Sequence, residues 1–295
     1  MLSFDSFNEE INKITRDFTQ KKILLTVSGG ADSMVMLDLF RKRSAEQSDF
    51  IISAAHINYK LRGEDSDLDQ KLVEDYCEKH EIPLFIYSVS EKDNKPENGS
   101  IQLWARELRY RFFHQICQEN SINFIATAHH LNDQLETFFI NLMRGSGLKG
   151  LSGIPANENK ILRPLLAFTK EEIYDFAEKN SVPFREDISN KKNDYLRNKI
   201  RNLIVPELVK ADSNFIQNFS KSLCIIQQSS DFIKQKAEEF IAENGTENDN
   251  WLIFNKEKLA ETQDIIKFEI LNKFGFGRYD KAASDIIAPA TLIVP

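Results

Sequence analysis

The sequence is poor in cysteine and has none of the spacings that cysteine-based sites need. Its three cysteines, Cys77, Cys117 and Cys224, stand far apart, and no C-x-x-C pair occurs. This argues against a disulfide framework and against a thiolate metal site. A secretory leader and an apolar run long enough to span a bilayer are also missing. We therefore expect a soluble protein of a reducing compartment with a cytoplasmic location.

An excess of basic residues, which marks many nucleic-acid-binding proteins, is absent as well. The 295 residues include 38 Lys and Arg against 45 Asp and Glu, which gives a formal net charge of −7. Such a chain has no global attraction for a polyanion. Any contact with RNA has to come from local basic patches.

Two common phosphate-binding signatures are missing too. The chain has neither the Gly-Lys-Ser/Thr ending of a Walker A loop nor a G-x-G-x-x-G dinucleotide turn. In their place, the apolar run 24–27 leads into S-G-G-A-D-S at residues 28–33, and apolar residues then recur at helical spacing. This order predicts a strand, a tight turn and a helix N-terminus. The free N–H groups and the dipole of that terminus favour an anion.

The residues of this turn suit a bound phosphate. Gly29 and Gly30 let the backbone approach an anion closely. Ser28 and Ser33 supply hydroxyl donors. Asp32 would repel a phosphate unless Mg²⁺ lay between them, so we predict a metal ion there. An ordinary glycine turn that opens an α/β helix is the competing interpretation.

Strand-like and helical segments alternate along the chain, which predicts an α/β fold with a doubly wound, mostly parallel sheet. The expected strands lie near 24–27, 50–57, 83–89 and 122–128, and the expected helices near 1–20, 34–40, 65–80, 101–119, 131–144 and 169–180. The glycine-rich segment 145–153 is expected to be a flexible loop over the site. From about residue 212 the apolar spacing is helical. We therefore place a catalytic domain at 1–211 and a smaller helical domain at 212–295.

A second group of polar residues follows the fourth expected strand, in the sequence T-A-H-H-L-N-D-Q-L-E-T at 127–137. On a helix, His130, Asp133 and Glu136 are three residues apart and share a face. Ligands bind beyond the carboxyl ends of parallel strands, where this segment and the turn at 28–33 both fall. The carboxylates could hold Mg²⁺ or bind an ammonium group, and the imidazoles could stabilise phosphate charge or move a proton. Acids that merely complement the helix dipole are the alternative.

Two groups of arginines are candidate phosphate sites. Arg106 and Arg109 share a helical face, and guanidinium groups suit bidentate contacts with phosphate. Pairing with nearby glutamates is the alternative for them. Residues 185–201 hold six basic residues against three acidic ones and could follow an RNA backbone. A solvated basic face is the alternative there.

Taken together, these motifs and others resemble one family over roughly residues 20–210. The shared segments are the turn at 28–33, His56-x-Asn58-x-x-Leu61-Arg62, Arg106-x-x-Arg109-Tyr110, Ala128-His129-His130-x-x-Asp133-Gln134-x-Glu136-Thr137, Arg144-Gly145-Ser146-Gly147, Arg163-Pro164-Leu165-Leu166 and Glu186-Asp187-x-Ser189-Asn190 with Arg197-Asn198-x-x-Arg201. The turn alone resembles the PP-loop superfamily of N-type ATP pyrophosphatases. The whole set resembles the tRNA(Ile)-lysidine synthetases. Two departures are Tyr59, where the family often has His, and Asn132, where it often has Asp.

The resemblance implies a ligase that uses ATP and Mg²⁺. Its substrates would be free L-lysine and an AUA-decoding tRNA(Ile) with a CAU anticodon. ATP would adenylate the oxygen at C2 of the wobble cytidine and release pyrophosphate, after which the lysine amine would displace AMP. Many family members continue into a further C-terminal tRNA-binding domain that this sequence does not reach, so we expect modest, salt-sensitive tRNA affinity. The oligomeric state stays open, with a homodimer as one alternative.

The resemblance also implies roles for individual residues. The expected catalytic residues are Asp32, His130, Asp133, Glu136 and Arg109, with Glu136 as the candidate for binding the lysine amine. The expected ATP-binding residues are Ser28, Gly29, Gly30, Ala31, Asp32, Ser33 and His56. Mg²⁺ is expected at Asp32 and Asp133. Contacts with tRNA are expected from Arg106, Arg144, Arg197 and Arg201, and from the helical region after residue 212.

Two other functions compete with this one. A tRNA sulfurtransferase of the same superfamily usually relies on paired cysteines, which the chain lacks. A non-catalytic nucleotide-binding module would need no acid pair such as Asp133 and Glu136. Release of pyrophosphate would separate an enzyme from such a module.

Overall fold

The structure is a computed structural model that describes residues 1–16, 18, 21–48, 50–93, 100–186, 196–248, 251–274 and 291–294. The middle of the predicted basic stretch, 187–195, lies outside the described residues. Two compact units are present. The first contains residues 1–145 and 153–220, and the second contains residues 146–152 and 221–295.

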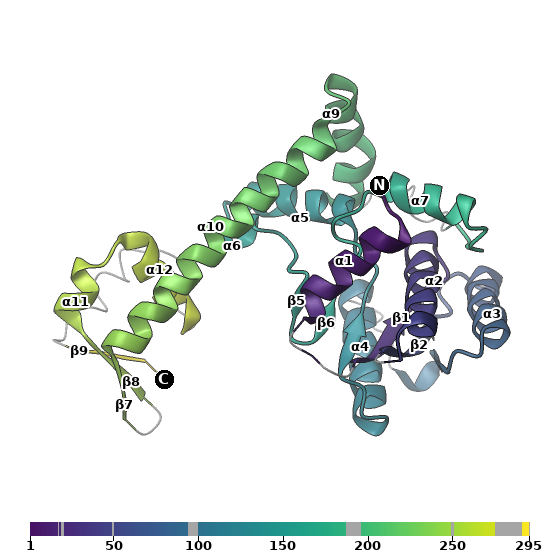
Figure 1. Cartoon of the computed structure of the whole chain (residues 1–295), viewed down its shortest axis with the longest axis horizontal. Coiled ribbons are helices and arrows are strands. Elements are labelled where there is room, and N and C mark those ends of the chain that lie inside the picture. Colours follow the sequence, from purple (N-terminus) through teal and green to yellow (C-terminus); the bar gives the residue numbers. More distant parts are fainter. Residues whose placement is uncertain are drawn as a thin grey trace. The chain divides into compact units, whose positions relative to one another are not determined.

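A mostly parallel sheet organises the first unit, which confirms the predicted fold class (Figure 1). Its strands are β1 (Lys21–Thr26), β2 (Phe50–Asn58), β3 (Leu84–Ser88), β4 (Phe124–Ala126), β5 (Asn157–Glu158) and β6 (Ile161–Leu162). In the part of the chain that is described, they lie in the order β3-β2-β1-β4-β6-β5. Only the short hairpin of β5 and β6 is antiparallel within this sheet. The sequence did not predict this hairpin, because two-residue strands leave no alternating pattern.

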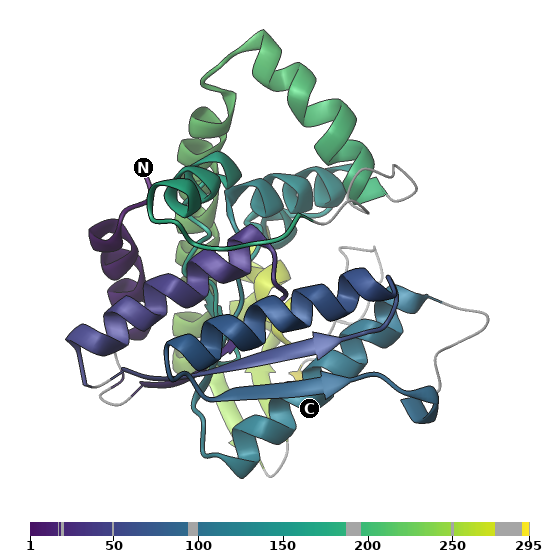
Figure 2. The same ribbon diagram turned by 90° about the vertical axis from the view of Figure 1, so that its right-hand side faces the viewer.

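Helices cover both faces of the sheet. Successive β1 side chains point to opposite faces, and apolar side chains on both faces have to be buried. Ile23 and Leu25 pack on the face that carries α1 (Phe4–Thr15), α2 (Ala31–Glu46), α3 (Glu64–Lys79) and α7 (Lys170–Lys179). Leu24 packs on the other face, with Phe113 of α4 (Ile101–Glu119). Figure 2 shows α2 and α3 along one side of the strands and α4 along the other. A sheet covered on both faces accounts for the continuous apolar run in β1.

The order of the strands reverses beside β1. From β1 the chain goes to β2 on one side, and β4 pairs with β1 on the other side, with Leu25 opposite Ala126. Ligands of doubly wound sheets bind at such a reversal, beyond the carboxyl ends of the strands. The residues after β1 lead into α2, and those after β4 lead into α5 (Leu131–Met143). The fold therefore brings both predicted motifs to one place.

The remaining helices of the first unit follow α7. They are α8 (Leu196–Lys199), a π-helical turn (Ile200–Ile204), α9 (Val205–Ala211) and the start of α10 (Phe215–Asn244). None of the described helices, α10 included, has the length and apolar content needed to cross a bilayer.

The second unit contains the rest of α10 together with α6 (Leu148–Leu151), α11 (Lys256–Glu261) and α12 (Asp264–Lys273). It also contains an antiparallel sheet of β7 (Gly245–Asn248), β8 (Trp251–Asn255) and β9 (Thr291–Val294). A small core forms around Phe254, Leu259 and Ile270. The sequence predicts the helices but not this sheet, because residues 244–250 are polar and read as a break. The expected glycine-rich loop likewise contains one helical turn, α6.

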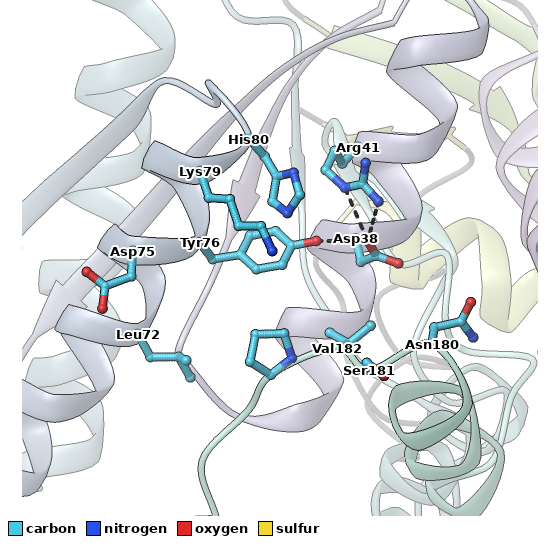
Figure 3. Close-up of a pocket in the computed structure, with 11 residues that line it drawn as sticks. Asp38, Arg41, Leu72, Asp75, Tyr76, Lys79, His80, Asn180, Ser181 and Val182 are labelled. Atoms are coloured by element: carbon cyan, nitrogen blue, oxygen red, sulfur yellow. Dashed lines mark hydrogen bonds and ion pairs between the residues drawn. The ribbon is translucent and has the colours of Figure 1, made fainter.

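A buried carboxylate ties α2 to its neighbours on one face of the sheet. Asp38 accepts hydrogen bonds from Tyr76 of α3 at 2.8 Å and from Arg41 at 2.7 Å. Lys42 lies 3.0 Å from the second Asp38 oxygen and donates to Asn180 at the end of α7. Figure 3 shows Tyr76 and Arg41 converging on Asp38 at a cavity of about 480 Å³. Burial opposes ionisation, but these donors outweigh it and hold the pKa of Asp38 below its ordinary value.

We expect Asp38→Asn to lower the free energy of unfolding by about 1–3 kcal/mol at neutral pH, because its cationic partners lose a buried charge. Since folding lowers the pKa of Asp38, its stabilising effect is complete above the unfolded value of about 3.9. The effect is lost as the pH falls through the folded pKa. In urea unfolding, the difference in the free energy of unfolding between Asp38→Asn and the parent should be constant at neutral pH. It should become smaller as the pH approaches 3.

Asp75→Asn is the matched control, because Asp75 lines the same cavity and is 60% exposed. Its effect should stay within about 0.5 kcal/mol at every pH. A deficit of Asp38→Asn that is equally large at pH 3 would contradict the assigned pKa direction.

Candidate active site

The turn after β1 is locked by its own serines. The Ser33 hydroxyl accepts the Ser28 N–H at 3.0 Å and donates to the Gly30 carbonyl at 3.0 Å. Gly30 is the N-cap of α2, with an extended backbone and no side-chain cap on the first turn. The N–H groups of that turn are therefore not used by a cap and are available to an anion. The structure brings the residues 28–33 together as the sequence predicts.

Gly29 is required by the close approach of α3. Its φ is +92°, and a Cβ atom placed there would lie 3.2 Å from Cβ of Asp69. Asp69 accepts hydrogen bonds from Arg62 at 2.6 Å and from Arg185 at 2.8 Å. The Arg185 N–H also donates to the Gly29 carbonyl at 3.0 Å. An ion-paired cluster thus supports the turn from outside.

This cluster borders a cavity of about 190 Å³ beside the turn. Its lining includes four cations, Arg62, Lys170, Arg185 and Arg201, and three acids, Asp32, Asp69 and Asp133. The sequence analysis did not assign Lys170, Arg185 or Asp69 to the site. Arg62 and Arg185 stood in quoted motifs or in the basic stretch, but no spacing linked them to the turn. Their partner Asp69 shared no motif at all.

His56 does not line either cavity at this edge of the sheet. Its ring is 3% exposed, and Nδ1 lies 2.9 Å from the Val27 carbonyl. Burial lowers the pKa of His56, which favours the neutral ring. His56 therefore braces the end of β1 from β2. Its expected contact with ATP stays a prediction.

His130 lies between the two motifs. Its Nε2 is 3.7 Å from an Asp32 oxygen and 3.6 Å from an Asp133 oxygen. Asp133 also accepts the His130 N–H at 3.0 Å at the start of α5. His129 instead bonds Thr127 at 2.8 Å, and burial lowers its pKa to about 4, so it is neutral at physiological pH. The structure thus joins Asp32, His130 and Asp133, as expected.

The buried acids differ in their preference for a proton. Burial raises the pKa of Asp32 and outweighs the neighbouring His130. Burial also penalises ionised Asp133, but His130 and Arg201 overcome it and lower the pKa of Asp133. Burial raises the pKa of Glu136 despite its arginine partners. The site therefore holds carboxyl groups of opposite tendency within one cluster.

Glu136 is bound by two arginines from the following helices. Arg201 Nε lies 2.5 Å from one oxygen of Glu136, which is 1% exposed. Arg197 Nε lies 3.3 Å from the other oxygen, and Arg201 reaches Asp133 at 3.4 Å. Arg201 belongs to the π-helical turn, a type of irregularity frequent at functional sites. Two arginines expected to meet tRNA thus lie on the site carboxylates.

A larger cavity of about 480 Å³ extends from the turn to α4. Arg106 and Arg109 line it, and neither forms an ion pair with a carboxylate in the described ranges. Their expected alternative, pairing with glutamates, is therefore not seen in the described part of the chain. Arg144 caps the end of α5, is exposed and lies outside this lining.

The residues present fit Mg²⁺ only when phosphate supplies further ligands. Asp32 Oδ1 is buried and has no hydrogen-bond partner. No group of three or more His, Cys, Asp or Glu among the described residues could hold a metal ion by itself. Mg²⁺ commonly uses one or two carboxylates together with substrate phosphates and water. Asp32 and Asp133, on either side of His130, match that requirement.

A glycine-bearing turn at the reversal of a parallel sheet, facing acids across the edge, defines a PP-loop protein. The family model of the PP-loop domain matches residues 4–208. The tRNA(Ile)-lysidine synthase of Petrotoga mobilis is 37% identical over 238 residues, which cover 79% of this chain and 76% of that protein. The chain therefore belongs to the tRNA(Ile)-lysidine synthase family of PP-loop proteins.

Other relatives are longer than the matched region. The tRNA(Ile)-lysidine synthase of Clostridioides difficile is 34% identical over 91% of this chain, but the match spans 59% of that protein. For that of Clostridium tetani, which is 39% identical, the match spans 42%. Among solved structures, the U34-tRNA thiolase NcsA from Methanococcus maripaludis superposes with a TM-score of 0.62 at 18% identity. The superposed region covers 76% of this chain and 78% of the NcsA chain. At that identity the likeness concerns the fold alone.

Gly29→Ala is expected to lower the free energy of unfolding by about 1–3 kcal/mol, because the new Cβ meets Asp69 and the backbone keeps a positive φ. Gly30→Ala is the matched control. Gly30 has a φ of −76°, and the nearest side-chain atom would lie 3.6 Å from its Cβ. Chemical denaturation should give near-parent stability for Gly30→Ala, and equal losses in both variants would contradict the close approach of α3.

Proposed function

We propose that this chain carries out the reaction of its family, in which ATP activates the wobble cytidine of tRNA(Ile) and free L-lysine replaces the activated oxygen. The observation that supports it most is the meeting of the turn with the acids of α5. Asp32 lies 3.7 Å from His130 across the reversal of the sheet, and Glu136 follows on the same helix. A module that only bound nucleotide would need no buried acids next to the phosphate site.

The two cavities suit the two parts of ATP. The smaller one adjoins the turn and carries Arg62, Lys170 and Arg185, so we assign it to the leaving pyrophosphate. The larger one has an apolar floor of Ala55, Ile57 and Phe113, so we assign it to the nucleoside and the cytidine. Both linings include Asp32, which supports our assignment of the bond that breaks to their junction.

Asp32 and Asp133 would hold Mg²⁺, which would neutralise charge on the phosphates when bound. The chain's own contribution to this step is placement. The locked serines and the N–H groups of α2 orient the α-phosphate, and the cations of the smaller cavity hold pyrophosphate as it departs. His130 lies within reach of both carboxylates and is suited to stabilise developing phosphate charge.

Glu136 is proposed to receive the lysine side chain in the second step. An ammonium group has to lose a proton before nitrogen can attack carbon, and a carboxylate accepts that proton more readily when its pKa is raised. Burial raises the pKa of Glu136. Before it accepts the proton, ionised Glu136 would also bind the ammonium through a charge-assisted hydrogen bond. In this structure, Arg197 and Arg201 form ion pairs with Glu136. We also propose that these two arginines contact tRNA.

The remaining assignments also stay proposals. Arg106, Arg109 and Arg144 are exposed cations suited to tRNA phosphates, and residues 212–295 are proposed to contact tRNA. We also propose that the reaction depends on Mg²⁺ and takes place in the cytoplasm, and a homodimer is one alternative for the assembly. The sulfurtransferase alternative has no support in these contacts, since the three cysteines are free and none is part of a pair.

Pyrophosphate release tests this function, with mass spectrometry of the tRNA to detect lysidine. We expect release to require tRNA(Ile) with a CAU anticodon, and lysidine to require L-lysine in addition. Asp32→Asn should reduce release by at least about 100-fold, because the metal–phosphate geometry loses its carboxylate. Thiolated tRNA as the product, or release from ATP alone, would exclude the proposed reaction.

The stability of the same variant provides an internal control. Burial raises the pKa of Asp32, so its ionised form destabilises the folded chain at neutral pH. Asp32→Asn should therefore be at least as stable as the parent, so that lost activity cannot be attributed to unfolding. Asp75→Asn, a change at an exposed carboxylate of α3, should leave pyrophosphate release unchanged.

Glu136→Gln is expected to separate the two half-reactions. Adenylation, measured as pyrophosphate release without lysine, should persist, whereas the KM for lysine should rise about 10- to 100-fold through loss of a charge-assisted hydrogen bond. Glu207→Gln, at an exposed glutamate of α9, is the matched control. Equal losses in both half-reactions would place Glu136 at the metal and phosphates instead.

A further inference from the structure

Two arginine–aromatic pairs stand at the α4 end of the larger cavity. The Arg109 guanidinium carbon lies 5.8 Å from the ring centre of Tyr59, and that of Arg106 lies 4.8 Å from the ring centre of Tyr110. All four residues line the cavity, as do Ser28 and Asp32 of the turn. Cations over aromatic rings form flat surfaces that resemble one face of a stacked base pair.

The Tyr59 ring is fixed before any ligand arrives. Its hydroxyl donates to the Ala105 carbonyl at 3.1 Å and accepts the Arg109 Nε–H at 3.0 Å. Trp104 meets the ring edge-on, with centres 6.4 Å apart, and donates its own N–H to the Asp93 carbonyl at 3.0 Å. A ring held from three sides loses little conformational freedom when it binds a flat ligand.

The two pairs, with Trp104 behind Tyr59, form what we call the arginine–aromatic wall of the cavity. Tyr59 and Trp104 are half-buried, whereas Arg106 and Arg109 are exposed on α4. Neither arginine is neutralised by a carboxylate in the described ranges, so both keep their charge for a phosphate. A base on the wall and a phosphate beside it are the two parts of one nucleotide.

The wall and the floor of the cavity make different contacts. Ala55, Ile57 and Phe113 line the apolar part of this cavity, which the proposed function assigns to the nucleoside of ATP and the wobble cytidine. Tyr59 stands at the end of β2, directly after Asn58, where the cavity meets α4. A polynucleotide that inserts one base into the cavity therefore brings the adjoining base to the wall.

We propose that Tyr59 and Arg109 stack the adenine that follows the wobble cytidine in the CAU anticodon, while Arg106 contacts the backbone phosphate between them. This rests on the proposed function, because it takes tRNA(Ile) as the substrate. A purine offers the larger stacking area, and stacking on aromatic side chains is the usual way of holding unpaired RNA bases.

Base stacking would also help an acidic chain to bind RNA, because it does not depend on net positive charge. With a net charge of −7, few phosphate contacts are available, and those weaken as salt rises. Base stacking is much less sensitive to salt than an ion pair. The wall therefore holds the anticodon where the overall field does not.

The test uses a tRNA(Ile) anticodon stem-loop in which 2-aminopurine replaces the middle adenine. This analogue loses fluorescence when it stacks, and binding is followed without ATP or lysine. The parent chain should quench the probe. Tyr59→Leu should abolish the quench and weaken binding about 5- to 150-fold, which is the range for losing one stacked base. Tyr59→Phe keeps the ring and should retain the quench.

Phe18→Leu is the matched control, because it removes a partly exposed aromatic ring that lies outside the cavity lining. It should leave quench and affinity at parent values. The Michaelis constant for ATP, measured by pyrophosphate release, should be the same in Tyr59→Leu and the parent. The quench and the affinity of each variant are measured at a temperature at which it is folded, or are corrected for its folded fraction.

Three outcomes would overturn the proposal. Binding of the stem-loop without quench means that the adenine lies elsewhere. A quench that survives Tyr59→Leu means that another ring stacks the base. Weaker ATP binding in Tyr59→Leu with the quench unchanged assigns the wall to the adenine of ATP. Because the fluorescence needs no chemistry, failure to form lysidine would refute the proposed function while leaving this result separate.

Discussion

The parallel pairing of β1 with both β2 and β4 is the constraint on which the site depends. Because all three strands point the same way, the segments that leave β1 and β4 emerge at one edge and start helices there. Asp32 and His130, far apart in sequence, thereby come within 3.7 Å. Both sit in the first turn or at the cap of a helix, where the dipole favours anions. The anion site is thus a property of strand order before any side chain is considered.

The electrostatics of the site follow from crowding acids into that edge. Glu136 is 1% exposed, whereas the side chains of Asp133 and Asp32 are 15% and 33% exposed. Like charges at such spacing cannot all be ionised without cations. The chain supplies part of the compensation through Arg201, and His130 separates two of the carboxylates. In the proposed reaction, Mg²⁺ and the lysine ammonium would supply the rest.

Local sequence patterns predicted most of the helices and strands of the first unit. The expected helix 101–119 agrees with α4 at both ends, because Ser100 caps its start, and the expected 131–144 agrees with α5 within one residue. The expected strand 122–128 shortens to β4, since the pairing with β1 spans only Phe124–Ala126. The antiparallel sheet of the second unit was missed because its strands pair across polar sequence that has no alternation.

Within the site, sequence reasoning found residues that share a motif and missed those that meet through the fold. The turn and the acids of α5 were both identifiable because helical spacing fixes which side chains are neighbours. The contact between Arg201 and Glu136 joins helices separated by 65 positions, and no local period encodes it. Asp69 was invisible for the same reason, although it decides why residue 29 is glycine.

The guanidinium groups on Glu136 have a consequence for how a positively charged ligand is recognised there. If Glu136 receives the lysine amine as proposed, the ammonium replaces a guanidinium instead of adding charge, because the carboxylate is 1% exposed and already paired with two arginines. The affinity for the ammonium is then the difference between two ion pairs and is small compared with either.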